Sequence, residues 1–351
     1  MQWTWRFGAL ADERHARLLG LKRLDQWTAV AQNDADPAVP STSQWRWTLT
    51  LPDLPANHVL IPSFAMLTDA AYGFRFALTY TSAGESGSAA LSHIGECGLS
   101  APALVQGEGV VAPIDCFVTC APLRNLQITL QLDAPAPPTE DVLLCISCRP
   151  WEIAPATGTL SNAAPLHAPA LSQMALSERF RHSACSPVCI AMGMGALGRN
   201  VEPEAFAAAV YHDGMFGVWP ANLYAASRHG VLGSIETFTH IDDAVALLDA
   251  GLPVIASTRW KEGELRNGAL ARSGGHLILL RGFSADAALV NDPAAASAGE
   301  VTRGYQREEF GRIWLRERGA AYMLLPMLLP MLLPTLYPML LAEARALPDA
   351  K

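Results

Sequence analysis

The chain has 351 residues, of which 50% are hydrophobic and 17% charged, and its formal net charge at pH 7 is -8. This length predicts about two domains, and the apolar content excludes a chain that is disordered throughout. The negative charge, without any lysine- or arginine-rich stripe, excludes a general nucleic-acid binder.

Short strands are predicted in the amino-terminal part of the chain. The clearest is 45–51, where large apolar side chains alternate with polar ones. Further strands are expected at 58–66, 74–81, 116–120, 126–132 and 142–148. Gly, Pro and Asp separate these segments, which is typical of a β-sandwich. Residues 1–153 are therefore predicted to form an all-β sandwich domain, with its tryptophans in the core.

The composition changes after residue 153. Residues 154–170 are rich in Ala, Pro, Ser and Gly and are predicted to be a linker. Beyond it, helices are expected at 187–197, 204–211, 220–228, 241–249 and 307–318, and strands at 253–257, 276–283, 288–291 and 321–325. Helices that precede an antiparallel sheet favour an α+β domain over a doubly wound one, and we assign it residues 171–326.

Residues 327–351 are predicted to form a separate tail, which continues a four-residue Leu/Pro repeat. No charge occurs between residues 319 and 342, so length alone would permit a membrane span. The repeat, however, places a proline at every fourth position from Pro326 to Pro338. Each proline would remove a helical hydrogen bond, which argues against a membrane helix and favours an extended tail.

The cysteines and the amino terminus indicate the cellular compartment. Seven cysteines, an odd number in a long chain, do not suggest a disulfide framework. The sequence at Met1 lacks the basic and then apolar layout of a signal peptide, so a cytoplasmic protein is expected, with secretion by another route left open.

Two cysteine pairs, Cys116 with Cys120 and Cys145 with Cys148, suggest a zinc site at first sight. Both pairs fall in predicted strands. Residues three apart on a strand point to opposite faces, so Cys145 and Cys148 would diverge. No metal site is therefore expected.

The strongest candidate for chemistry is Cys185, which lies in the stretch Ala184-Cys185-Ser186-Pro187 ahead of an apolar run that can be helical. Proline suits the first turn of a helix, where its missing N–H would be unpaired anyway. Free N–H groups and the helix dipole lower the pKa of a thiol at that position. Cys189, one turn later, is expected to pack in the core.

A nucleophilic cysteine needs a base and a group that orients the base. His276 follows Ser273-Gly274-Gly275 and opens an apolar strand. Asp292 ends the next predicted strand and could accept a hydrogen bond from the imidazole and stabilise the imidazolium. The spacing alone does not fix the register between these two strands.

Four segments carry a family resemblance: Leu171-Ser172-Gln173-Met174, Ala184-Cys185-Ser186-Pro187, Gly274-Gly275-His276-Leu277 and Val290-Asn291-Asp292-Pro293. Together they resemble the stand-alone C39-like branch of the papain-like cysteine peptidases, over about residues 171–326. The resemblance implies an α+β fold, namely a papain-like cysteine peptidase domain preceded by an all-β sandwich domain. It implies a peptide or protein substrate and no cofactor.

The resemblance also implies a role for individual residues. Cys185 would be the nucleophile, His276 the general base and acid, and Asp292 the carboxylate that orients the imidazole. Gln173 would donate its side-chain amide to the oxyanion, together with the backbone N–H of Cys185. Gly275 and Trp219 would contact the substrate. The chain departs from the family pattern at Val188-Cys189, where small polar residues are usual, and at Val218, where Asn is usual.

The sequence thus predicts a cysteine-dependent hydrolase that cleaves a peptide or amide bond through a thioacyl-enzyme, using a Cys-His-Asp triad. Two alternatives stay open. The acyl group could pass to an amine or thiol, which would make the protein an acyltransferase, or the domain could be a catalytically silent binding protein. The sequence does not indicate an oligomeric state.

Overall fold

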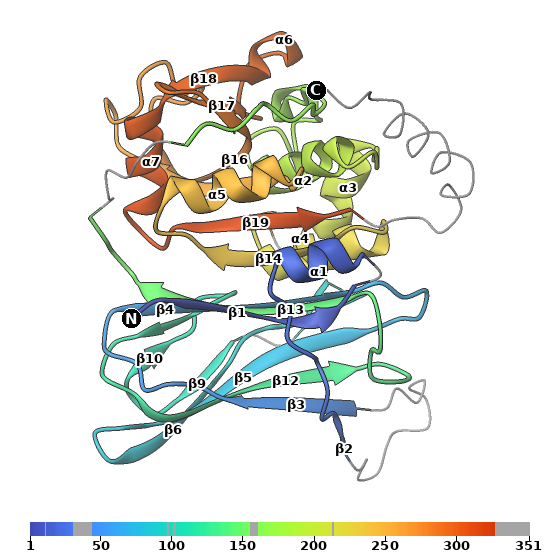
Figure 1. Cartoon of the computed structure of the whole chain (residues 1–351), viewed down its shortest axis with the longest axis vertical. Coiled ribbons are helices and arrows are strands. Elements are labelled where there is room, and N and C mark those ends of the chain that lie inside the picture. Colours follow the sequence, from blue (N-terminus) through green and yellow to red (C-terminus); the bar gives the residue numbers. More distant parts are fainter. Residues whose placement is uncertain are drawn as a thin grey trace, which may run out of the picture.

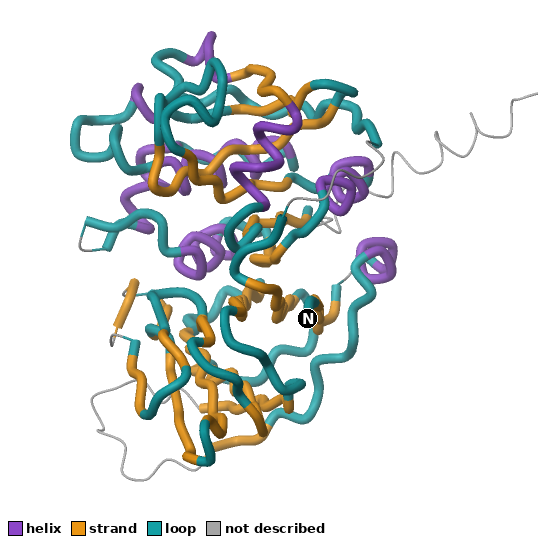
Figure 2. Tube along the Cα trace, turned by 90° about the vertical axis from the view of Figure 1, so that its left-hand side faces the viewer, coloured by secondary structure: helices purple, strands orange, loops and turns teal. Residues whose placement is uncertain are grey.

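The computed structural model describes residues 1–10, 12–30, 44–96, 98–100, 103–154, 161–212 and 214–326. Cys97, linker residues 155–160 and the predicted tail 327–351 lie outside these ranges. Strands dominate the first half of the chain, whereas the second half combines helices with a sheet (Figures 1 and 2).

The first half consists of β-strands and one short helix. In chain order these are β1 (Trp3–Ala9), α1 (Glu13–Leu18), β2 (Thr28–Val30), β3 (Gln44–Thr50), β4 (His58–Met66), β5 (Gly73–Ser82), β6 (Glu85–Ala90), β7 (His93–Gly95), β8 (Gly98–Ser100), β9 (Leu104–Gln106), β10 (Val110–Val111), β11 (Phe117–Thr119), β12 (Arg124–Asp133) and β13 (Val142–Pro150). All six strands predicted here are present, with shifted ends in most cases.

The described strands of this half form two antiparallel sheets. One has the order β1-β13-β4-β11-β10, and the other the order β2-β3-β12-β5-β6-β9, with β7 paired to β5 and β8 to β7. Alternating apolar side chains from both sheets share one core, which contains Trp47 from β3, Phe64 from β4 and Leu130 from β12. The alternation predicted for residues 45–51 is therefore confirmed, and the amino-terminal tryptophans also pack on this core.

Strands β4 and β13 are buried on both faces. On β4, Leu60 and Phe64 face the core between the two sheets, whereas Val59 and Ile61 belong to a second core shared with the other half of the chain. Cys145 and Cys148 of β13 likewise diverge, because Cys148 lies in the first core while Cys145 lies near Glu236. The sheet that contains β4 and β13 is thus a middle layer of the molecule (Figure 1).

The second half begins with the short 3-10 helix η1 (Gln173–Ala175) and three helices, α2 (Cys185–Ala196), α3 (Pro203–Val210) and α4 (Trp219–Arg228). Then follow β14 (Leu232–Thr237), α5 (Ile241–Asp249), β15 (Val254–Trp260), β16 (Ser273–Phe283), β17 (Ala287–Asn291), α6 (Ala298–Val301), β18 (Thr302–Gln306), α7 (Arg307–Leu315) and β19 (Ala320–Leu325). Every helix and strand predicted here is present, while β14, β18 and the two short helices η1 and α6 were not predicted.

The described strands of this half form one antiparallel sheet in the order β14-β19-β15-β16-β17-β18. Apolar side chains of α2 pack on one face, where Leu277 and Leu279 of β16 point. Helices α5 and α7 cover the other face, where Ile278 and Leu280 point. The prediction of helices combined with an antiparallel sheet is confirmed.

The described residues 161–170 pack against the last residues of β16, beyond the point where β16 pairs with β15. Ala163 pairs with Phe283 through two backbone hydrogen bonds of 3.0 Å, and the Leu166 N–H donates to the carbonyl of Arg281 at 2.7 Å. Asn291 then donates from its side chain to the carbonyl of Pro169 at 3.0 Å. This segment is therefore docked on β16 and β17 in the structure.

Polar contacts join the two halves. Strand β14 is an edge strand, and two of its N–H groups, those of Ile235 and Thr237, donate to the hydroxyls of Ser63 on β4 and Ser147 on β13, at 3.0 and 3.1 Å. Arg6 of β1 forms an ion pair with the buried Glu236 of β14. Two backbone N–H groups at the edge of one sheet thus find their hydrogen-bond acceptors in side chains of another sheet.

Within the described part of the chain, no helix is both long and apolar enough to cross a bilayer.

Candidate active site

Cys185 is the first residue of α2, and its sulfur lies at the end of a helix whose next nine residues are all buried. Ala184, at the N-cap, has no side chain that could bond the free N–H groups of the first turn. The positive end of the helix dipole therefore acts on the thiol without competition from a capping side chain. Cys185 itself is partly exposed.

Cys189 lies one turn further along α2 and is fully buried, as predicted. Its thiol donates to the carbonyl of Leu277 at 3.2 Å. Burial, together with the nearby Cys185 and Asp292, raises the pKa of Cys189 well above its ordinary value. This second thiol stays protonated and holds the helix against β16.

His276 lies near the start of β16, next to Cys185, and its side chain forms a hydrogen bond with the sulfur. The residue is only 2% exposed. The ring of Trp260, the last residue of β15, meets the imidazole edge-on with 5.8 Å between ring centroids. The imidazole is therefore shielded from water on that side.

Asp292 directly follows β17 and completes the cluster. The pairing of Asn291 with Leu279 brings the end of β17 beside the middle of β16. As a result His276 Nε2 lies 2.8 Å from Asp292 Oδ1, although 16 positions separate the two residues in sequence. Because Nε2 is bonded to the carboxylate, Nδ1 is the ring nitrogen left for the sulfur.

The charges of these three groups support one another. Burial alone lowers the pKa of His276, but Asp292 and Cys185 outweigh it and raise this pKa to about 10. Burial alone raises the pKa of Cys185 and of Asp292, yet the hydrogen bonds and charge of His276 bring both below their ordinary values. The three groups therefore favour the charged forms, a thiolate, an imidazolium and a carboxylate, in one another's presence.

Gln173 connects the segments that carry the two outer members of the cluster. Its backbone N–H donates to the carbonyl of Pro293, the residue after Asp292, at 2.8 Å. Its side-chain Nε2 donates to the carbonyl of Arg181, four residues before Cys185, at 2.8 Å. A carboxamide has two N–H groups, so this bond leaves a second donor.

The two residues expected to contact substrate lie in different environments. Gly275 is exposed on β16, and a Cβ there would meet no atom within 4 Å. Trp219 is 4% exposed and stacks beneath the guanidinium of Arg318, 5.1 Å from its ring. Its backbone N–H donates to Asp115 at 3.4 Å, so Trp219 lies at the junction of the two halves in the structure.

Two residues that touch the cluster had no predicted role. Tyr305 of β18 donates its hydroxyl to Asp292 Oδ2 at 2.6 Å, and Trp260 packs on His276. Tyr305 lies in a stretch of the family resemblance, but its contact depends on the pairing of β17 with β18. Trp260 ends a strand whose predicted end was three residues earlier.

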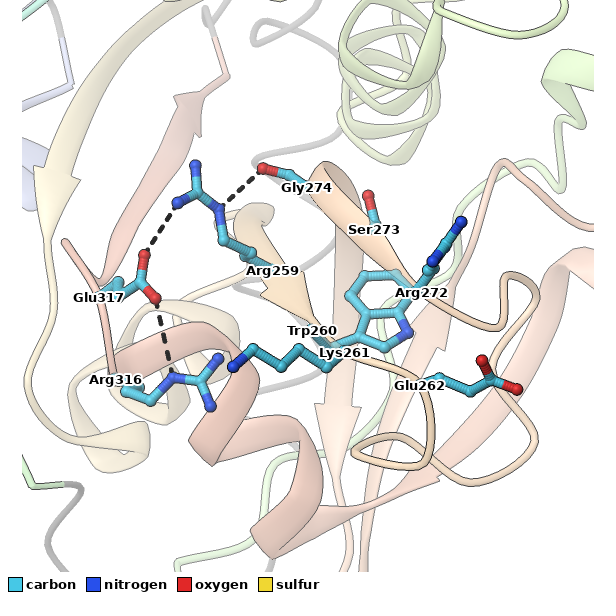
Figure 3. A pocket seen from close by; sticks show the side chains of 9 residues that line it. All are labelled: Arg259, Trp260, Lys261, Glu262, Arg272, Ser273, Gly274, Arg316 and Glu317. Carbon is cyan, nitrogen blue, oxygen red and sulfur yellow. Dashed lines mark hydrogen bonds and ion pairs between the residues drawn. The ribbon is translucent and has the colours of Figure 1, made fainter.

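A groove of about 500 Å³ is formed by the end of β15, the start of β16 and the two residues that follow α7 (Figure 3). Gly274, two residues before His276, and Trp260, whose ring packs on the imidazole, are among its lining residues, whereas Cys185, His276 and Asp292 are not. Arg259 bridges Glu317 and the carbonyl of Gly274, at 3.0 and 2.8 Å. The side chains of Lys261 and Arg316 reach toward one another across the groove.

Among the described residues, no group of three or more His, Cys, Asp or Glu side chains could hold a metal ion.

Comparisons with known proteins place this geometry in context. Residues 165–322 match the model of the Peptidase C39 like family. A search of curated proteins found no match.

Two solved structures are similar to part of the chain. A candidate C39-like peptidase from Bacillus anthracis is 16% identical, with 47% of this chain and 98% of that chain covered and a TM-score of 0.36. A double glycine motif protease from an AMS/PCAT transporter, solved in complex with the leader peptide, is 19% identical, with 48% of this chain and 100% of that chain covered and a TM-score of 0.32.

Proposed function

The carboxy-terminal half of the chain, over residues 165–322, belongs to the peptidase C39-like family, and we propose that Cys185, His276 and Asp292 are the catalytic triad of a cysteine peptidase with a papain-like fold. One observation carries the proposal. A cysteine at a helix start, a buried histidine and a buried aspartate, from α2, β16 and the end of β17, form one hydrogen-bonded chain.

The proposed reaction begins with attack of the Cys185 thiolate on the carbonyl carbon of a peptide bond. The backbone N–H of Cys185 and the second N–H of Gln173 stabilise the oxyanion. When the carbon–nitrogen bond breaks, His276 gives its proton to the leaving amine and a thioester remains. His276 then takes a proton from water, and the hydroxide releases the acid and regenerates the thiolate.

The charge balance of the cluster suits these steps. His276 keeps its proton up to a pKa of about 10, so it is a ready general acid for the amine. Asp292 stabilises the imidazolium and holds it in one orientation. We place the substrate chain along the groove beside Gly274 and Gly275, where the missing side chains allow a close approach.

The proposal is tested by site-resolved alkylation with iodoacetamide followed by mass spectrometry. Cys185 should react at pH 6, and Cys120, an exposed thiol of the first half, serves as the reference within the same molecule. Preferential labelling of Cys185 at this pH supports a thiolate, and equal or slower labelling overturns the proposal.

A second experiment tests catalysis. Cys185→Ala should reduce cleavage of a peptide library to below about one-thousandth of the wild-type rate, as expected for loss of a nucleophile. Cys189→Ala is the matched control, because it removes a buried, protonated thiol from the same helix. Added hydroxylamine separates the alternatives. Capture of the acyl group in preference to hydrolysis indicates an acyltransferase, and a labelled Cys185 without any turnover indicates a binding protein.

A further inference from the structure

The carboxylate of Asp292 is held at both oxygens by different strands. Oδ1 bonds His276 of β16 at 2.8 Å, and Oδ2 accepts the hydroxyl of Tyr305 of β18 at 2.6 Å. Tyr305 is 1% exposed. Burial and the neighbouring carboxylate raise the pKa of Tyr305, so that its hydroxyl remains a neutral donor.

Tyr305 is also bonded to the segment 261–272, which connects β15 to β16. Its hydroxyl accepts the backbone N–H of Ala269 at 3.2 Å. The next residue, Leu270, accepts the indole N–H of Trp260 at 3.3 Å, and this indole packs on the imidazole of His276. Two adjacent residues of one segment are therefore bonded to the two side chains that touch the carboxylate and the imidazole.

The segment 261–272 also forms one side of the groove in Figure 3, through Lys261, Glu262 and Arg272. Two residues in the middle of the segment are bonded to groups outside the proposed active site. Arg266 forms an ion pair with Glu309 of α7, and Arg303 donates to the carbonyl of Asn267. The segment thus contacts the groove at its ends and Tyr305 near its middle.

We propose that Tyr305 is a positioning residue for Asp292, and that through Ala269 it couples the conformation of segment 261–272, and so the groove, to the Cys185–His276 pair. The inference rests on the proposed function, because it assigns the groove and the ion pair to one active site. A substrate chain that moves the segment would alter the hydrogen bond between Tyr305 and the carboxylate of Asp292. The reactivity of the Cys185 thiol would change as a result.

The groups that face Asp292 determine how a substitution of Tyr305 would change the pKa of the Asp292 carboxyl. They are His276 from β16, Tyr305 from β18, the Ala294 N–H at 2.9 Å and, from α2, the protonated Cys189. The Tyr305 hydroxyl and the Ala294 N–H both lower the pKa of Asp292. Loss of the hydroxyl therefore raises this pKa, and protonation of Asp292 removes the partner that stabilises the imidazolium.

The test is the pH profile of Cys185 alkylation by iodoacetamide in the full chain, which requires no substrate. In Tyr305→Phe the acid limb should move to higher pH by about one unit, so that the rate at a fixed pH on that limb falls about tenfold, the usual size for one lost hydrogen bond to a charged group. At pH 9 the rate should change little, because Asp292 is ionised there with or without the Tyr305 hydroxyl. Tyr80→Phe is the matched control, since the buried hydroxyl of Tyr80 has no hydrogen-bond partner among the described residues.

Ala269→Pro tests the coupling, because it removes the N–H that the segment donates to Tyr305. A smaller shift in the same direction supports the coupling. An unchanged profile overturns the coupling, and an unchanged profile in Tyr305→Phe overturns the positioning role. If wild-type Cys185 shows no reactivity at pH 6, the proposed function fails instead. Circular dichroism checks each fold, and if Tyr305→Phe does not fold, Ala269→Pro still decides the coupling.

Discussion

At the scale of single residues, the site depends on a balance between burial and charge. His276 is 2% exposed and Asp292 is fully buried, so each would lose its charge if it stood alone. Their mutual hydrogen bond, together with the sulfur of Cys185, reverses the effect of burial at all three positions. Removal of any one charge should therefore affect the protonation of the other two.

This coupling predicts the pH dependence of turnover. The Cys185 pKa lies below its ordinary value and the His276 pKa is about 10, so the ion pair exists between them. We expect kcat/KM to fall on the acid side as the thiolate gains a proton, and on the alkaline side near pH 10 as the imidazolium loses one. A profile measured from pH 4 to 11 on a cleaved peptide is the check. A maximum near pH 9 with no plateau at neutral pH would contradict the ion pair.

Gln173 offers a sharper prediction, because oxyanion stabilisation matters only when an oxyanion forms. Gln173→Ala should lower kcat about 100-fold, the usual size for one lost oxyanion donor. It should leave the rate of Cys185 alkylation nearly unchanged, since alkylation passes through no oxyanion. Parallel losses in both assays would instead mean that Gln173 holds the local structure, through its bonds to Pro293 and Arg181.

Candidate residues were predictable from sequence where they follow local rules. Cys185 precedes a proline at a helix start, and His276 and Asp292 stand at the ends of apolar runs. The role of Tyr305 was not predictable, because its contact with Asp292 requires the pairing of Ala288 with Tyr305, which local sequence does not encode. The burial of Trp219 likewise depends on Asp115 and Arg318, which are distant in the chain.

At the scale of elements, the helices were the easiest to predict. The predicted helix at 241–249 matches α5 residue for residue, and those near α3 and α4 begin one residue late. Strand β14 escaped prediction because Leu232–Thr237 lacks alternation, and the structure explains this by burying all six residues. Its polar residues are tolerated since Glu236 is paired with Arg6.

The docking of residues 161–170 on β16 depends on a glycine. A Cβ at Gly282 would lie 2.7 Å from the carbonyl oxygen of Ala163 and 3.0 Å from the backbone of Pro165. Gly282→Ala should therefore push the segment away and lower the free energy of unfolding by about 2 kcal/mol, as overpacking commonly does.

Urea denaturation is the measurement for this prediction, with Gly304→Ala as the control. Gly304 lies in the same sheet, and a Cβ there would make only an ordinary contact of 3.6 Å with Ala287. Equal midpoints for the two variants would show that the backbone of residues 163–165 yields to the added methyl group.

At the scale of the whole molecule, the sheet that contains β4 and β13 lies between the other sheet of the first half and the second half of the chain (Figure 1). Its two faces contribute side chains to two different hydrophobic cores. Arg149 of β13 is buried and donates to the carbonyls of Phe238 and Leu315, which lie on the other half. We therefore expect the two halves to unfold together.

Removal of the two serine hydroxyls that accept hydrogen bonds from the edge of β14 tests this expectation. In the double variant Ser63→Ala and Ser147→Ala, the N–H groups of Ile235 and Thr237 lose their acceptors in a buried interface. Each orphaned donor should cost about 1–3 kcal/mol. Calorimetry should show one transition in the wild type and a lower Tm in the variant, whereas Ser88→Ala on the exposed face of β6 should have little effect. Two separate wild-type transitions would contradict cooperative unfolding.

The burial of β4 and β13 on both faces has a practical consequence for enzymology. A chain cut down to residues 165–322, the region that matches the family, would expose the apolar surface that Val59 and Ile61 now cover and leave Glu236 without its arginine. Such a fragment would be prone to aggregate, so an inactive fragment would say nothing about the chemistry of Cys185. Assays belong on the full-length chain.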